Sequence, residues 1–192
     1  MPKDVAPPDS ARRDEVLELA YRYVLDRGIA GLSLRPLAAA VGSSPRVLLF
    51  LFGSKDGLVR ALLARARADE LELLDRMRVT GRDVGVAAVV DAVWRWLAAP
   101  GHRPLLRLWA EGYARSLVDP AGPWAGFAEA TVEDWLALLA SAQPPAVRDS
   151  AAGAAERTLA LAVLRGAMLD LLATGDAGRA AAAIDRHLRF AP

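Results

Sequence analysis

The sequence contains no cysteine among its 192 residues. Disulfide bridges, thiolate metal sites and a cysteine nucleophile are therefore excluded. Histidine is scarce too, and His102 and His187 have no companion at metal-ligand spacing. We also find no nucleophile elbow, no glycine-rich phosphate loop and no paired carboxylates in a plausible cleft. The sequence thus predicts a protein that is not an enzyme and that uses no cofactor and no metal.

Long apolar runs and a strong net charge are also missing. No apolar stretch approaches the roughly 18 residues of a membrane span. The first nine residues contain Asp4 and prolines, where a signal peptide has a basic region followed by an apolar segment. We therefore expect a cytoplasmic protein that does not enter the membrane. The formal net charge is +1, so any argument for nucleic-acid binding must rest on local features.

What the sequence does contain is helical periodicity. Hydrophobic residues make up 54% of the chain, enough for a sizeable core, and no stretch alternates as a strand would. Glycine, proline and serine positions divide the periodic segments. The predicted helices are 11–27, 34–41, 45–52, 55–78, 84–98, 104–117, 123–141, 146–174 and 177–188. The expected fold is all-α, with an N-terminal three-helix helix-turn-helix head and a C-terminal helical bundle.

The second and third predicted helices have the spacing of a helix-turn-helix. Ala38 is small where two helices must cross closely, and Gly42 allows a tight turn. The apolar wedge between the helices would be Leu37, Val41, Leu48 and Leu51. Serine precedes the second, third and fourth helices at Ser33, Ser44 and Ser54, where its hydroxyl can cap the first turn. A plain helical hairpin would satisfy part of this pattern.

The longer segment 28–58, GIAGLSLRPLAAAVGSSPRVLLFLFGSKDGL, resembles the head of the TetR family of bacterial transcriptional regulators. The matching positions are Gly28, Leu37, Ala38, Gly42, Ser44, Leu48, Phe52, Ser54, Lys55, Asp56 and Leu58. The resemblance covers the first 60 or so residues by motif and the remainder by helical layout and length. It implies a DNA-binding domain over 11–56 and a ligand-binding and dimerisation domain over 57–192. Residues 1–10 are expected to be a disordered arm, because they contain three prolines and little to bury.

The third helix departs from the family pattern. Leu49 stands where relatives carry a phosphate-contacting tyrosine, and Phe50 and Leu51 stand where histidine is frequent. Two interpretations remain open. The apolar side chains contact thymine methyl groups in the major groove, or this face is buried and DNA binding is weakened or lost. We predict a DNA-binding set of Arg35, Ser44, Arg46, Val47, Leu49, Phe50 and Lys55. Residues 1–60 hold nine basic against seven acidic residues, so phosphate contacts should come from a few placed charges.

All five tryptophans lie between residues 94 and 135, where the resemblance places the helices around an effector pocket. Aromatic side chains with a few polar groups are typical of a small-molecule site, although tryptophans in a bundle are more often core. The predicted pocket residues are Trp94, Trp109, Glu111, Tyr113, Phe127 and Trp135. Arg107, Glu111 and Arg115 share one helix face, and this spacing fits either a solvated ion-pair ladder or an acidic anchor for a cationic ligand.

The last two predicted helices are rich in leucine and alanine, which suits a symmetric four-helix contact. The predicted homodimer interface is Leu161, Leu164, Met168, Leu172, Ile184 and Leu188. The sequence thus indicates a homodimeric, sequence-specific regulator of transcription that binds an operator in duplex DNA and is released by a small-molecule effector. The alternative is a degenerate member that binds a ligand or a protein partner but not DNA.

Overall fold

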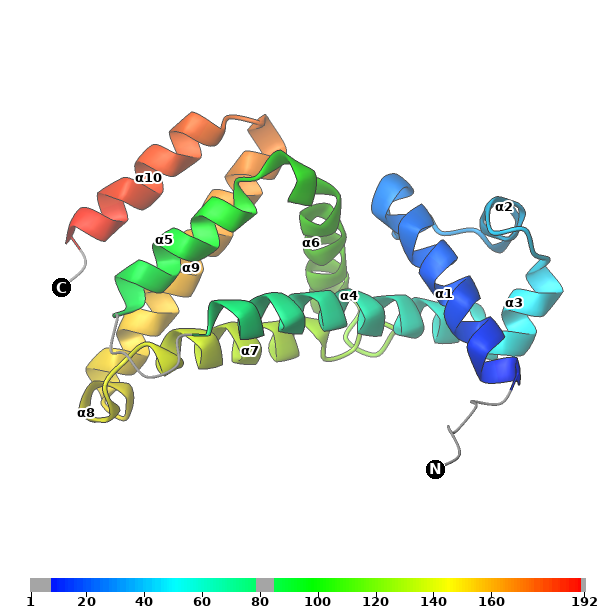
Figure 1. Ribbon diagram of the computed structural model, residues 1–192, viewed down its shortest axis with the longest axis horizontal. Coiled ribbons are helices and arrows are strands. Elements are labelled where there is room, and N and C mark those ends of the chain that lie inside the picture. Colours follow the sequence, from blue (N-terminus) through cyan, green and yellow to red (C-terminus); the bar gives the residue numbers. More distant parts are fainter. Residues whose placement is uncertain (1–7, 79–84, 191–192) are drawn as a thin grey trace, which may run out of the picture. The chain divides into compact units, whose positions relative to one another are not determined.

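The computed structural model of the chain describes residues 8–78 and 85–190 (Figure 1). Within these ranges every regular element is a helix, which confirms the predicted all-α class. The α-helices are α1 Pro8–Arg27, α2 Leu34–Ala40, α3 Pro45–Phe52, α4 Lys55–Met77, α5 Val86–Leu97, α6 Arg103–Val118, α7 Phe127–Ser141, α8 Pro145–Arg148, α9 Ala151–Thr174 and α10 Ala177–Phe190, with a 3₁₀ turn η1 at Pro100–His102. None of the described helices combines the length and apolar character needed to cross a membrane.

Serine caps begin two of the three helices that follow α1. The Ser44 hydroxyl accepts the Val47 N–H at 3.2 Å, and the Ser54 hydroxyl accepts the Gly57 N–H at 2.9 Å. Each cap satisfies a backbone donor that the first helical turn leaves free. Ser33 occupies the corresponding position before α2, but its hydroxyl makes no cap hydrogen bond. The prediction that the Ser33 hydroxyl caps α2 is therefore wrong, although α2 does begin at Leu34.

Two predicted helices are shorter or divided. The helix expected over 123–141 begins at Phe127, because the preceding residues form successive turns and Gly126 has a φ of +73°. The helix expected over 146–174 is interrupted before Ser150, whose hydroxyl accepts the Gly153 N–H at 3.0 Å and starts α9. Ser150 is thus a helix cap that the sequence analysis missed. Residue 84 and the predicted break at Thr80-Gly81 lie outside the described residues, as do residues 1–7 of the predicted arm. Residues 8–10 already belong to α1.

The chain divides into two compact units. Unit 1 is Met1–Ala68 with Arg107–Ala128, and it contains the helix-turn-helix. Its core contains three of the four predicted wedge residues, together with Ala38 and Phe52. Leu37, Ala38, Val41 and Leu48 are buried, whereas Leu51 is half-buried. Burial of these side chains between α1, α2 and α3 fixes how α3 is presented.

Unit 2 is Asp69–Leu106 with Glu129–Pro192. Its helices α5, α9 and α10 pack against one another, and Figure 1 shows them side by side. Val90, Val93, Leu164, Leu171 and Ile184 are among the side chains buried in this unit. A bundle of this kind buries one apolar face of each helix. Apolar residues on the other faces are therefore not accounted for by packing within the unit.

Candidate nucleic-acid interface

Helix α3 separates its apolar residues between two faces. Leu48 and Phe52 are buried, while Val47 and Leu49 are 38% and 41% exposed and Phe50 is 74% exposed. Arg46 is exposed in the first turn. The face of α3 that carries the predicted DNA-binding residues Val47, Leu49 and Phe50 is therefore not buried. This exposure fits the interpretation in which the apolar side chains contact thymine methyl groups in a major groove, and not the one in which this face is buried.

The basic residues of the predicted set are also accessible. Arg35 is exposed in the first turn of α2, and Lys55 is exposed as the first residue of α4. The beginning of an α-helix carries free N–H groups and a partial positive charge. Lys55 adds its ammonium at this position, so the start of α4 is suited to a phosphate oxygen. Ser44, by contrast, uses its hydroxyl to cap α3.

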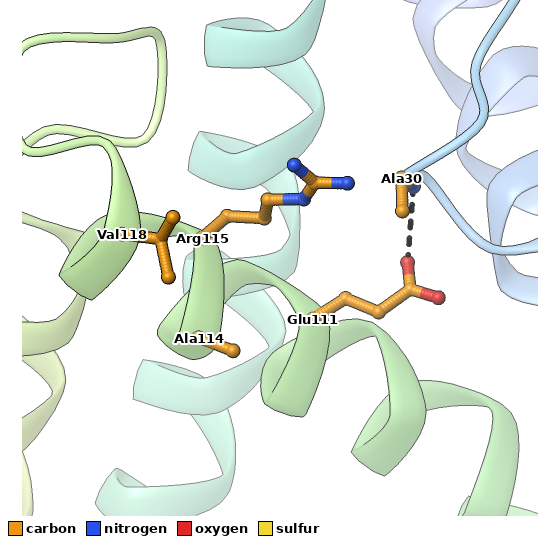
Figure 2. Close-up of a pocket in the computed structure, with 5 residues that line it drawn as sticks. All are labelled: Ala30, Glu111, Ala114, Arg115 and Val118. Carbon is orange, nitrogen blue, oxygen red and sulfur yellow. Dashed lines mark hydrogen bonds between the residues drawn. The ribbon is translucent and has the colours of Figure 1, made fainter.

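A carboxylate from α6 holds the turn between α1 and α2. One oxygen of Glu111 accepts the Ile29 N–H at 2.7 Å and the Ala30 N–H at 3.2 Å, and Figure 2 shows the contact with Ala30. Gly28 ends α1 with a φ of +79°, and a Cβ at this residue would lie 2.8 Å from the other Glu111 oxygen. Glycine is therefore required at residue 28 both by the backbone conformation and by the close carboxylate.

A surface pocket of about 230 Å³ lies beside this contact within unit 1. Ala30, Glu111, Ala114, Arg115 and Val118 line it, and Figure 2 shows Arg115 and Glu111 extending from successive turns of α6. Of the residues predicted to line an effector pocket, this pocket contains Glu111. The Glu111 carboxylate is used by the Ile29 and Ala30 N–H groups, and no ion pair joins it to Arg107 or Arg115 among the described residues.

The other predicted pocket residues are divided between the units. Trp109, Tyr113 and Phe127 belong to unit 1, and Trp94 and Trp135 belong to unit 2. All except the half-buried Tyr113 are buried. The Trp109 indole donates to the Ala66 carbonyl at 3.3 Å, as expected for a tryptophan packed in a core. An aromatic effector pocket among these residues stays a prediction.

A buried acid in unit 2 was missed. Glu70 is 1% exposed, and its carboxylate accepts the indole N–H of Trp135 and lies 3.5 Å from the Thr131 hydroxyl. Its place in the helical period was a usable signal. Glu70 lies four residues after Ala66 and four before Leu74, both buried, so it falls on the buried face of α4.

The predicted interface residues differ in exposure. Leu161, Leu164 and Ile184 are buried within the chain itself, and Met168, Leu172 and Leu188 are half-buried. The exposed apolar residues of α9 are instead at other positions of its period. They include Leu159, which is 57% exposed, Ala162, Gly166, Leu169, which is 49% exposed, and Ala173. Contact of the six predicted residues with a second chain stays a prediction.

Comparison with known proteins agrees with this architecture. Residues 16–62 match the family of bacterial regulatory proteins described as the tetR family. The HTH-type transcriptional regulator Rv1816 of Mycobacterium tuberculosis is 38% identical over 64 residues, which are 33% of this chain and 27% of the regulator. The match thus spans about a quarter of that relative's length.

Structural similarity extends over nearly the whole chain. The multidrug binding protein EbrR, solved in complex with imidazole, has a TM-score of 0.70 and 26% identity over 100% of this chain and 97% of its own. A TetR transcription regulator from Haloarcula marismortui has a TM-score of 0.73 at 15% identity, covering 95% and 97% of the two chains. The head over residues 16–62 therefore matches the tetR family of bacterial regulatory proteins, and the whole chain shares its all-helical fold with EbrR.

Proposed function

We propose that the chain is a DNA-binding regulator of transcription that works as a homodimer and represses until a small molecule releases it from its operator. The exposed face of α3 carries the proposal, because Arg46, Leu49 and Phe50 are accessible together on the helix that this motif inserts into the major groove. Arg46 would reach a guanine edge, and Lys55 would contact phosphate. Selection of bound sites from random duplexes tests the function, and no enrichment at low salt would contradict it.

The apolar side chains of α3 should read thymine. If Phe50 contacts a thymine C5 methyl group, replacing that thymine by uracil should weaken binding by about three- to tenfold, since uracil lacks only the methyl group. Phe50→Ala should weaken binding to the thymine duplex by a similar factor and bind the two duplexes almost equally. Fluorescence anisotropy with the selected duplex and its uracil form measures both effects.

Lys55→Ala is the matched control for this cycle. A phosphate contact carries no base information, so its loss should weaken binding to the thymine and uracil duplexes by the same factor. Equal binding of the two duplexes by the wild-type protein would contradict methyl readout by this helix.

The homodimer is proposed to form through the exposed apolar stripe of α9, with α10 beside it. Leu159, Ala162, Gly166, Leu169 and Ala173 follow one another at spacings of four and three residues, which places them on one side of the helix. Small residues at Ala162 and Gly166 leave room for a close approach of a second helix. A dimer would set the distance between two α3 helices that enter successive major grooves.

An aromatic cation is the effector class that unit 2 supports best. EbrR has been solved in complex with ethidium and with proflavin. In this chain Glu70 supplies a buried carboxylate beside the indole of Trp135, and the two groups offer a cation an ionic and a π contact. Trp94 is buried in the same unit.

Ethidium is a suitable probe for this effector site. Titration followed by tryptophan emission should show saturable quenching, and Glu70→Gln should weaken ethidium binding by about tenfold. Glutamine still accepts the Trp135 N–H, so binding of neutral N-phenylnaphthylamine should change little. A loss of affinity of the same size for both probes would contradict a role for the charge.

A further inference from the structure

We propose that Glu111 is a positioning residue for DNA recognition, because it holds the first turn of the helix-turn-helix motif in place. The inference rests on the proposed DNA-binding function, and it assigns a role to a side chain on α6 that does not belong to the motif. Glu111 would act through the backbone of the α1–α2 turn, without touching DNA.

The two hydrogen bonds satisfy donors that the local chain leaves free. Gly28 donates to the Val24 carbonyl at 2.8 Å and thereby ends α1. The next two N–H groups, of Ile29 and Ala30, turn away from the helix and donate to a single carboxylate oxygen of a residue 82 and 81 positions further along the chain. Both donors are thereby satisfied by one side-chain oxygen, and a backbone N–H left without a partner in a part-buried turn costs free energy.

The turn is joined rigidly to the recognition helix. Ile29 and Leu32 are 1% and 5% exposed, and the Leu32 N–H donates to the Ile29 carbonyl at 3.1 Å. Helix α2 begins two residues later and packs against α3. A shift of the backbone at Ile29 therefore displaces side chains of a close-packed core, and this displacement reaches the helix that carries Arg46 and Phe50.

Two substitutions separate the effect of the length of the Glu111 side chain from the effect of its negative charge. Glu111→Asp keeps the negative charge but shortens the side chain by one methylene, so its carboxylate no longer reaches both N–H groups. Glu111→Gln removes the charge but keeps a carbonyl oxygen at the same distance from the backbone. A positioning role predicts that the aspartate variant is impaired and that the glutamine variant behaves almost as the wild type. A role for the charge, as an anchor for a cationic ligand, predicts the opposite order.

Two measurements on the full-length protein decide between these roles. For Glu111→Asp we expect about tenfold weaker binding to the selected duplex, unchanged binding to random duplex at low salt, and about tenfold faster hydrogen exchange at the amides of Ile29 and Ala30. For Glu111→Gln we expect values within about threefold of the wild type. Glu133→Gln, at an exposed residue of α7, controls for the loss of one negative charge. NMR exchange rates and anisotropy titrations supply both readouts.

The possible outcomes separate this inference from the function on which it rests. If the wild-type protein enriches no duplex, the proposed function is wrong, and the exchange rates still decide whether Glu111 holds the turn. If the wild type binds its duplex and Glu111→Asp binds it equally well, the positioning role is overturned. Equal weakening of specific and random binding by Glu111→Asp would also overturn it, because loss of folded protein lowers both alike.

Discussion

Glutamate at Leu169 should convert the proposed dimer into a folded monomer. The leucine is 49% exposed in the single chain, so the substitution removes little from the core. Association, however, would bury one unpaired charge in each copy, and desolvating such a charge costs several kcal/mol. We expect the dimer dissociation constant to rise by about 100-fold or more, as measured by sedimentation equilibrium. The loss of helical circular dichroism signal on thermal unfolding should be as large in Leu169→Glu as in the wild type.

DNA binding should fall together with the dimer. Two linked heads bind an operator with a high effective concentration for the second contact, and a monomer loses this advantage. Affinity for a duplex with two half-sites should therefore drop by about 100-fold. Leu117→Glu is the matched control, because it introduces the same charge at a 64% exposed leucine of α6. A wild-type chain that sediments as a monomer at micromolar concentration would contradict the proposed interface.

Glutamate at Ile184 should instead unfold the C-terminal helices. Ile184 is 0% exposed, and α10 packs on both α9 and α5, so the carboxylate would be enclosed within unit 2. A buried charge without a partner, combined with the lost apolar contacts, should lower the free energy of unfolding by roughly 4 kcal/mol or more. Denaturant titration followed by circular dichroism measures this loss.

Ala137→Glu places the same charge on the exposed face of α7 in the same unit and should change the free energy of unfolding by less than about 0.5 kcal/mol. If Ile184→Glu instead unfolds at the same denaturant concentration as the wild type but no longer forms a dimer, Ile184 belongs to the interface between chains, as predicted from the sequence.

The head could be predicted from local chemistry because its signals are local. Ser44 and Ser54 cap the N–H groups three residues ahead, and the buried Leu37, Ala38, Val41 and Leu48 follow a single helical period. The exposed face of α3 was the open question there. The helical pattern placed Leu48 in the wedge correctly, but it also placed the half-buried Leu51 there and left open whether the face with Leu49 and Phe50 is buried.

The body could not be predicted in the same detail, since its determinants are distant in sequence. The partners of Glu111 lie more than 80 residues away, and nothing in the neighbouring arginines points to a backbone turn. In α9 apolar residues surround the helix. The sequence therefore predicted an apolar contact but did not distinguish the face with Leu161 and Leu164, buried in the chain, from the face with Leu159 and Leu169.

Insertion of the exposed Leu49 and Phe50 into a major groove, as we propose, would also change the thermodynamics of operator binding. A helix that enters a groove with apolar side chains removes hydrocarbon surface from water, and this gives association a negative heat capacity change. The binding enthalpy then becomes more favourable as the temperature rises, while the entropy becomes less favourable. With a surplus of two basic residues in the first 60, few counterions would be released from the DNA. Operator affinity in this chain should therefore depend less on salt, and its enthalpy more on temperature, than in a regulator whose recognition helix is polar.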